Sequence, residues 1–230
     1  MTEWHEGKVA TSHPAAAGLH EVLIDVKGSP LVGTHVLPGQ YVRLRLDGSG
    51  EGIFAIASEP GVSAERFELL VKEGSELADS LIESPVGTRV RLTAPEGPGF
   101  PLERGRGHRV LLFATGSGIS AIRSLIFSLR REREAFRDIT LFFGARTPSA
   151  FAYQDEFVDW QRSGITVIQT VSQPGAPGWN GLTGYVQAHL PQESLEDAVA
   201  FVCGQTGMVG DVRTSLRQRG IPADHIFLNV

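Results

Sequence analysis

Residues 109–126 read RVLLFATGSGISAIRSLI, and this stretch decides the fold. The run VLLFA (110–114) is apolar throughout, which is typical of a strand buried on both faces of a parallel sheet. A glycine-rich turn, TGSG (115–118), follows, and the residues after it predict a helix over about 120–132. A buried strand, a turn and a helix in succession predict the first unit of an α/β domain.

The turn at 115–118 has the composition of a phosphate-binding loop. Glycine permits a tight turn and lets a ligand approach the backbone closely. The N–H groups at the start of the next helix would then face an anion such as a pyrophosphate. The alternative is a turn that binds nothing, and the strand–turn–helix context favours nucleotide binding. One feature of the dinucleotide fingerprint is missing, because GART (144–147) stands where an acid would read the ribose.

Downstream, strands and helices continue to alternate. Buried strands are expected at 138–145, 164–170 and 198–204, with helices near 154–162, 184–190 and 208–219. A second glycine turn, CGQTGM (203–208), ends one of these strands and opens a helix. Ligands of open α/β sheets collect at the carboxyl ends of the strands, so both glycine turns are predicted to lie on the ligand side.

Upstream, the pattern changes to short strands. Runs at 21–26, 41–46, 53–58, 66–71 and 89–94 are β-branched or alternating, and one helix is expected at 75–83. The segment 97–109, rich in Gly, Pro and Arg, reads as a linker, and residues 1–106 carry the whole net charge of −5. We therefore predict two domains: an antiparallel β-barrel at 1–104, followed by a doubly wound α/β domain at 108–230.

Composition narrows the function. The single cysteine, Cys203, excludes an intrachain disulfide and a cysteine-ligated iron–sulfur cluster, and the seven histidines lack zinc-ligand spacing, so no metal is expected. The acidic net charge and the lack of a basic patch with aromatics argue against nucleic acid. No apolar run reaches the roughly 20 residues of a membrane span, and acids stand where a signal peptide would be basic. We expect a cytoplasmic protein.

Several motifs together carry a family resemblance: ATGSGIS followed by IRSLI, FGAR followed by AYQDEF, GYVQAHL, and CGQ followed by Met208. With a β-rich first half, they make the chain similar to the ferredoxin–NADP reductase superfamily. Within it, the chain most resembles the plant "fruit protein" oxidoreductases and their bacterial relatives. The resemblance covers nearly the whole chain. It implies an FAD-binding barrel joined to an NAD(P)-binding domain.

The resemblance also implies roles for single residues. Cys203, the one catalytic candidate, and Gly204 would lie under the nicotinamide. Phe54 would stack on the flavin, within the strand that continues through Ala55, Ile56, Ala57 and Ser58. The other implied cofactor contacts are, for the flavin pyrophosphate, Val71, Lys72, Gly74 and Ser75; for the NAD(P) pyrophosphate and ribose, Thr115, Gly116, Ser117, Gly118 and Ile119; and for the adenosine, Arg146, Gln205 and Met208.

The flavin strand departs from the family pattern. The family motif Arg-x-Tyr-Ser/Thr is replaced by GIFA (52–55), so the Arg on the pyrophosphate and the hydroxyl near flavin N5 are both absent. A charge-assisted bond contributes about 1.5–3 kcal/mol, so FAD affinity is expected to fall by about tenfold to a hundredfold. Glu76 and Asp79 add negative charge nearby, and Arg43 or Arg45 could provide another anchor. FAD held weakly, FMN and no flavin at all remain open.

We therefore predict a flavin-dependent NAD(P)H oxidoreductase that passes electrons from the nicotinamide through FAD to an acceptor that the sequence does not identify, with a redox protein or a quinone as candidates. NADH is favoured over NADPH because Ser172-Gln173-Pro174 stands where NADPH enzymes of the family carry Ser-Arg, although Arg146 or Arg162 could compensate. Two alternatives stay open. One is an electron-transfer subunit that needs a protein partner, and the other is a flavin-free nucleotide-binding module.

Overall fold

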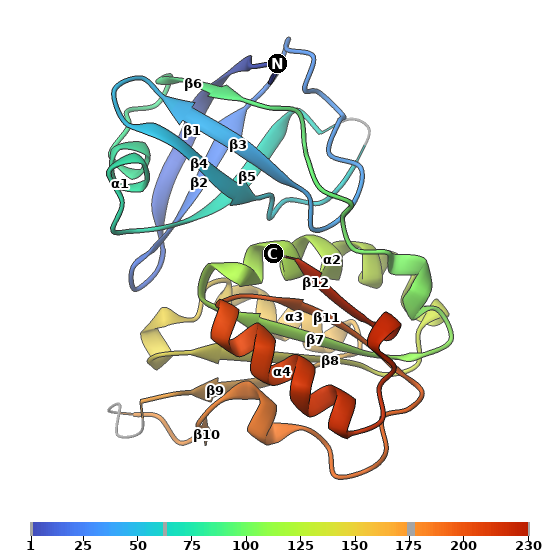
Figure 1. Ribbon diagram of the computed structural model, residues 1–230. Coiled ribbons are helices and arrows are strands. Elements are labelled where there is room, and N and C mark those ends of the chain that lie inside the picture. Colours follow the sequence, from blue (N-terminus) through green and yellow to red (C-terminus); the bar gives the residue numbers. More distant parts are fainter. Residues whose placement is uncertain (1, 62–63, 174–177, 230) are drawn as a thin grey trace.

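The computed structural model describes residues 2–61, 64–173 and 178–229, so Pro174 lies outside the described residues. Two sheets organise the chain, one above the other in Figure 1. The first half of the sequence builds an antiparallel sheet, and the second half builds a parallel sheet with helices on both faces. This is the two-domain architecture predicted from the sequence, and we propose that the division lies at residues 104–108, as expected above.

The antiparallel sheet curls into a barrel. Its strands follow the order β4-β3-β6-β1-β2-β5. An isolated bridge between Ile56 and Leu69 brings the two edges, β4 and β5, together. Alternate side chains point inward and form one apolar core, which includes the fully buried Val22, Leu44 and Phe67. The strand bounds are β1 His5–Ala16, β2 Leu19–Asp25, β3 Tyr41–Leu46, β4 Gly50–Ala55, β5 Arg66–Lys72 and β6 Arg89–Leu92.

A short helix, α1 (Glu76–Ile82), covers one end of the barrel. Ser75 caps it, because the Ser75 hydroxyl accepts from the backbone N–H of Ala78 at 3.2 Å. Leu77 and Leu81 face the barrel core, and the acidic Glu76 lies in the first turn.

The parallel sheet has the order β10-β9-β8-β7-β11-β12. The chain starts in the middle at β7, moves to one side through β8 and β9, and then crosses to β11 on the other side. The order therefore reverses between β7 and β11, which is where doubly wound sheets bind ligands. The bounds are β7 Arg109–Thr115, β8 Ile139–Ala145, β9 Ile165–Val171, β10 Leu182–Thr183, β11 Ala198–Cys203 and β12 Ile226–Asn229.

Helices cover both faces of this sheet (Figure 1). α2 (Ile119–Arg131) and α3 (Phe157–Arg162) pack on the face turned toward the barrel, where Trp160 and Phe201 are buried. α4 (Thr206–Gln218) packs on the opposite face through Val209, Val212 and Leu216. No helix among residues 2–61, 64–173 and 178–229 is both long and apolar enough to cross a membrane.

Most predicted elements are present within a few residues of their expected bounds. The strands β1, β10 and β12 were not predicted, and the sequence explains the omission of β1 and β12. β1 was not predicted because its sequence, HEGKVATSHPAA, has few apolar positions and buries only Gly7 and Val9. β12 is four residues long and follows a proline turn closely. The helix expected near 184–190 is a single 3₁₀ turn, Val186–His189, and the strand expected at 53–58 is shifted to Gly50–Ala55.

Candidate functional site

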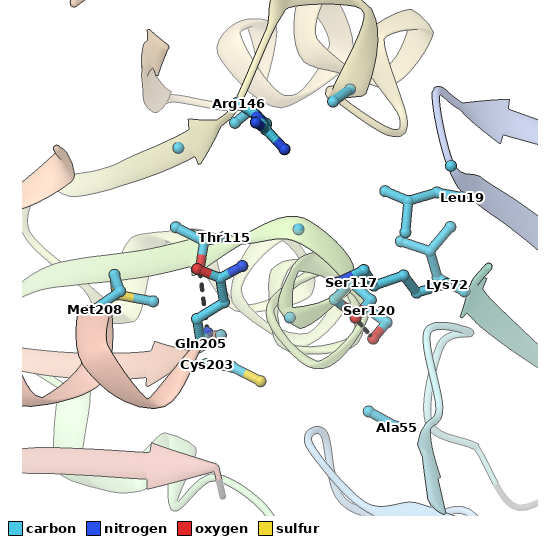
Figure 2. A pocket seen from close by; sticks show the side chains of 18 of the residues that line it. Leu19, Ala55, Lys72, Thr115, Ser117, Ser120, Arg146, Cys203, Gln205 and Met208 are labelled. Carbon is cyan, nitrogen blue, oxygen red and sulfur yellow. Dashed lines mark hydrogen bonds between the residues drawn. The ribbon is translucent and has the colours of Figure 1, made fainter. Parts of the chain in front are cut away.

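A cleft of about 1490 Å³ separates the barrel from the carboxyl edge of the parallel sheet. Residues of both halves line it (Figure 2). Most of the residues that the sequence singled out meet there, although they come from strands, turns and a helix that are far apart in the sequence. Those that line it are Phe54, Ala55, Lys72, Ser75, Thr115, Gly116, Ser117, Gly118, Arg146, Cys203, Gly204, Gln205 and Met208.

The two glycine turns interlock at the topological switch point. A Cβ on Gly118 would lie 2.6 Å from both the carbonyl oxygen of Cys203 and the Cα of Gly204. These neighbours are backbone and cannot move aside, so only glycine fits at position 118. Thr115 ties the turns together, because its Oγ1 accepts from the backbone N–H of Gln205 at 3.2 Å. The close approach leaves bare backbone facing the cleft.

The first of these turns leads directly into the N-terminus of α2. A short 3₁₀ turn, Gly116–Gly118, precedes the 13-residue helix, and no side chain caps its N–H groups among the described residues. The Ser120 hydroxyl donates to the carbonyl of Ser117 at 2.6 Å and so is turned back onto the loop. A long helix with an uncapped N-terminus, opening on a cleft, suits an anionic group such as a pyrophosphate.

The α/β side of the cleft carries the guanidinium of Arg146, which is held by the neutral amide of Gln173. Arg146, just after β8, lines the cleft, and its Nε and Nη2 donate to the Gln173 amide oxygen at 3.0 and 3.1 Å when that amide is turned to satisfy both residues. An amide does not neutralise the charge, so Arg146 stays available to a ligand. Tyr185, which is 68% exposed, and Asp211 also line the cleft.

Sequence reasoning missed these last two residues. Tyr185 lies in the GYVQAHL motif that carried the family resemblance, so a signal for it was present. Asp211 lies on α4 and had no signal of its own, because only the fold brings that helix to the cleft. Gln187 joins them, since its Nε2 donates to Asp211 Oδ2 at 3.3 Å.

Cys203 ends β11 at the centre of the cleft, with its side chain directed toward the space between the two halves (Figure 2). The residue is only 9% exposed. Burial raises the pKa of its thiol to about 12, so the thiol is neutral at physiological pH. A neutral thiol is a poor nucleophile, and Cys203 is placed to support a ligand by contact rather than to attack it.

The barrel half offers a flat apolar surface. Phe54 and Ala55 at the end of β4 line the cleft with Leu19 and Leu70. Gly52 is crowded, because a Cβ there would lie 2.8 Å from Leu77 Cδ2 and 3.1 Å from the Phe54 ring. Phe54 and Leu77 therefore occupy the space beside position 52, where the resemblance expects an arginine.

Charge in the barrel half is mostly negative. Glu51 and Glu76 line the cleft, and Lys72 is the one cation that the described part of the barrel contributes to it. Arg43 and Arg45, expected as alternative phosphate anchors, do not line the cleft. Each is paired with an acid instead: Arg45 Nη2 lies 2.8 Å from Glu51, which itself lines the cleft, and Arg43 Nε lies 3.3 Å from Glu96.

The remaining predicted residues do not line the cleft. The side chains of Ile56, Ala57, Val71 and Ile119 are fully buried in the core, so only their backbone could approach a ligand. Ser58 accepts from the backbone N–H of Glu68 at 3.3 Å, which directs it away along the barrel. The Gly74 N–H donates to Asp79 at 2.9 Å, so that acid already occupies one donor expected to bind phosphate.

Comparison with known proteins agrees with this geometry. Residues 112–214 match the model of the oxidoreductase NAD-binding domain. The fruit protein pKIWI502 of Actinidia deliciosa is 34% identical, over 98% of this chain and 76% of that protein. Ferredoxin–NADP reductase B of Sorangium cellulosum is 32% identical, over 83% of each. The solved structure of a ferredoxin NADP⁺ reductase from Neisseria gonorrhoeae, with bound FAD and NADP, shares the fold with a TM-score of 0.80 at 16% identity, over 99% and 98% of the two chains.

Proposed function

The chain belongs to the ferredoxin–NADP reductase superfamily, and on that premise we propose that it passes electrons from NADH, through FAD held in its cleft, to an acceptor outside the chain. It is an NAD(P)H-dependent FAD oxidoreductase by family. The observation that carries the proposal is the single cleft, because one continuous space is lined by the glycine turns of the sheet and by Phe54 of the barrel.

The nucleotide half fits a nicotinamide dinucleotide. The Gly118 cradle and the N-terminus of α2 would hold the pyrophosphate, and Arg146 and Tyr185 would hold the adenosine. Cys203 and Gly204 at the switch point would then support the nicotinamide, where the cleft reaches toward Phe54. These roles are proposals about residues that line the cleft.

The flavin half fits the ring better than the phosphates. Phe54 provides a flat face, and Ala55 and Ala78 leave room beside it. The pyrophosphate would rely on Lys72 and on the backbone near Ser75, against the charge of Glu76. We therefore propose FAD held about tenfold to a hundredfold more weakly than an Arg-anchored site would hold it, with FMN as the other candidate.

When both cofactors are bound, NADH supplies the hydride and FAD accepts it. The chain contributes position and shelter. Cys203 on the sheet side would support the nicotinamide and Phe54 on the barrel side would support the flavin, so the chain would hold both cofactors in one cleft. The neutral thiol of Cys203 would place an uncharged surface beside the nicotinamide.

We propose NADH as the preferred donor. Gln173 stands where a guanidinium would read a 2′-phosphate, and the carboxylate of Asp211 lines the same part of the cleft. The positive charge of Arg146 favours NADPH instead, because a guanidinium can bind a 2′-phosphate. Steady-state kinetics with both nucleotides would decide, and a strong preference for NADPH would refute the proposal.

The decisive experiment is an anaerobic titration of the FAD-reconstituted protein. We expect NADH to bleach the visible absorbance of the flavin. A protein that binds no FAD or FMN would instead be the nucleotide-binding module, and the proposal would fall. If the flavin bleaches, turnover with ferricyanide or a quinone separates a self-sufficient reductase from a subunit that needs a redox-protein partner. The cytoplasmic location expected from the sequence stays a prediction, which cell fractionation would check.

A further inference from the structure

We propose that Arg123 is a positioning residue that sets the spacing between the two cofactor surfaces by clamping the barrel to α2. The expected effect on the rate of flavin reduction rests on the proposed function. The expected effect on the orientation of the two halves rests on the contacts of Arg123 alone. No assignment above gives this residue a role, because it lies outside the cleft.

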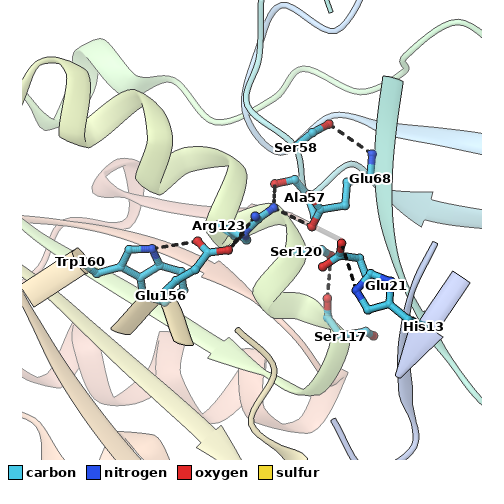
Figure 3. Close-up of polar contacts among 10 residues, drawn as sticks. All are labelled: His13, Glu21, Ala57, Ser58, Glu68, Ser117, Ser120, Arg123, Glu156 and Trp160. Atoms are coloured by element: carbon cyan, nitrogen blue, oxygen red, sulfur yellow. Dashed lines mark hydrogen bonds and ion pairs between the residues drawn. The ribbon is translucent and has the colours of Figure 1, made fainter. Parts of the chain in front are cut away.

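The clamp joins both halves of the molecule through one guanidinium (Figure 3). Arg123 Nη1 donates to Glu68 Oε1 of β5 at 2.6 Å and to the carbonyl of Ala57 at 3.1 Å. Its Nε donates to Glu156 Oε1 at 2.8 Å. Two of these partners are barrel groups, and Glu156 belongs to the α/β half.

Glu156, the partner on the α/β side, is itself held in place. Glu156 accepts from the indole N–H of Trp160 at 3.2 Å, and Trp160 is fully buried. The guanidinium lies over the ring of Tyr153 at 4.4 Å, and Tyr153 holds a left-handed backbone with φ 59°. Arg123 is 9% exposed, so water offers little alternative to these contacts. A planar group with fixed donors on three sides allows one arrangement of the two halves.

The clamp lies close to both cofactor surfaces in the chain. Arg123 is one helical turn after Ile119, where α2 begins at the proposed pyrophosphate site. Ala57 lies two residues past the end of β4, the strand that carries the proposed flavin surface at Phe54 and Ala55. A shift of α2 against this strand would therefore move one ring against the other, and a displacement of about 1 Å can lower a rate by about a hundredfold.

Stability is a weaker explanation for the clamp. Buried ion networks are often replaced by apolar residues of similar volume with no loss of stability. Apolar packing between the halves is already present, since Leu19, Leu70 and Phe100 of the first half are buried with α2 in one cluster. The ion network adds hydrogen bonds of fixed direction to this packing, and these restrict the orientation of the two halves further.

The test compares wild type with the all-apolar variant Arg123→Met/Glu68→Met/Glu156→Met, which leaves no unpaired buried charge. We expect this variant to stay folded, with NADH and FAD dissociation constants within about threefold of wild type. The rate of flavin reduction at saturating NADH should fall by about tenfold to a hundredfold. The variant Arg123→Lys, which keeps the charge but cannot reach three partners, should show part of the same loss. Arg131→Met, which removes the exposed contact to Glu59, is the matched control and should be unchanged.

A second readout needs no flavin. Residual dipolar couplings of backbone amides should fit one alignment tensor for both halves of wild type, and two different tensors for the triple variant. One shared tensor in the variant, or reduction at the wild-type rate, would overturn the inference. If wild type itself fails to reduce flavin, the proposed function falls, and the dipolar couplings still decide whether Arg123 sets the orientation.

Discussion

The two walls of the cleft present different chemical groups to a ligand. The α/β wall offers backbone, with Gly118 pressed against Gly204 and the N–H groups of α2 behind them. The barrel wall offers side chains, mainly the ring of Phe54 among small and acidic neighbours. Backbone sites depend on one or two residues that no substitution can replace. Side-chain sites tolerate change, and in the barrel wall glycine stands at position 52, where the resemblance expects an arginine.

The largest expected effect breaks the backbone wall. Gly118→Ala places a methyl group 2.6 Å from the backbone of Cys203 and Gly204, so the turns must separate. We expect NADH affinity to fall by about a hundredfold or more, with FAD affinity little changed. Gly210→Ala is the matched control, because a Cβ there meets nothing within 4 Å and Gly210 does not line the cleft. Equal losses for both cofactors would show that the two walls are not independent.

The next expected effect is a loss of folding stability at acidic pH that originates in the barrel half. His35 is fully buried in the barrel, and burial lowers its pKa from 6.5 to about 4. Between these values the unfolded chain binds a proton that the folded chain does not, so stability falls as pH drops through 6.5 toward 4. The loss from this group is about 3 kcal/mol.

Urea unfolding at several pH values would measure this loss. His35→Phe should lose less stability on acidification than wild type by about that amount, 3 kcal/mol. His108→Leu, on the surface of the α/β half, should behave as wild type. If His35→Phe loses as much stability on acidification as wild type, His35 is not the source of the loss.

A third change gives the barrel wall a phosphate anchor. Gly52→Arg alone would crowd Leu77, so the test is Gly52→Arg/Leu77→Ala. We expect FAD to bind about tenfold to a hundredfold more tightly, because the guanidinium would pair with the pyrophosphate. Gly52→Met/Leu77→Ala controls for volume. Equal FAD affinity in the two double variants would show that a positive charge at position 52 does not strengthen FAD binding. Fluorescence quenching of the flavin provides the dissociation constants.

The smallest expected effect lies where the walls meet. Cys203→Ala should slow flavin reduction at saturating NADH by about tenfold, with the NADH dissociation constant nearly unchanged, because the nicotinamide loses lateral support. Cys203→Ser, close in size, should retain most of the rate. Since the thiol pKa is about 12, iodoacetamide should label native Cys203 slowly near pH 8. Rapid labelling, or an unchanged rate in Cys203→Ala, would contradict this placement.

The difference between the walls also explains what could be predicted. Strand, glycine turn and helix are contiguous in the sequence, so Thr115–Gly118 and Cys203–Gly204 were found and do line the cleft. The barrel wall draws single residues from several strands, and alternation along a strand turns every second one inward. Ile56 and Val71 were therefore predicted as contacts, and their side chains lie in the barrel core, whereas Ala57 is buried between the barrel and α2.

Other features depended on contacts that no local pattern records. Arg43 and Arg45 had the charge of a phosphate anchor, but they are paired with Glu96 and Glu51. Asp211 reaches the cleft only because α4 follows the strand beside the switch point. Arg123 belongs to the quoted motif IRSLI, and its partners stand more than thirty positions away in sequence.

The order of strands has a consequence for how the protein is made. All six barrel strands lie within residues 5–92, whereas the parallel sheet stays incomplete on one side of β7 until β11 (Ala198–Cys203) is added. Roughly a hundred residues are synthesised in between, at about 5–20 per second. The barrel can therefore fold on the ribosome first. Its Leu19, Leu70 and Phe100 then stay open to solvent or to a chaperone until the rest of the chain arrives to cover them.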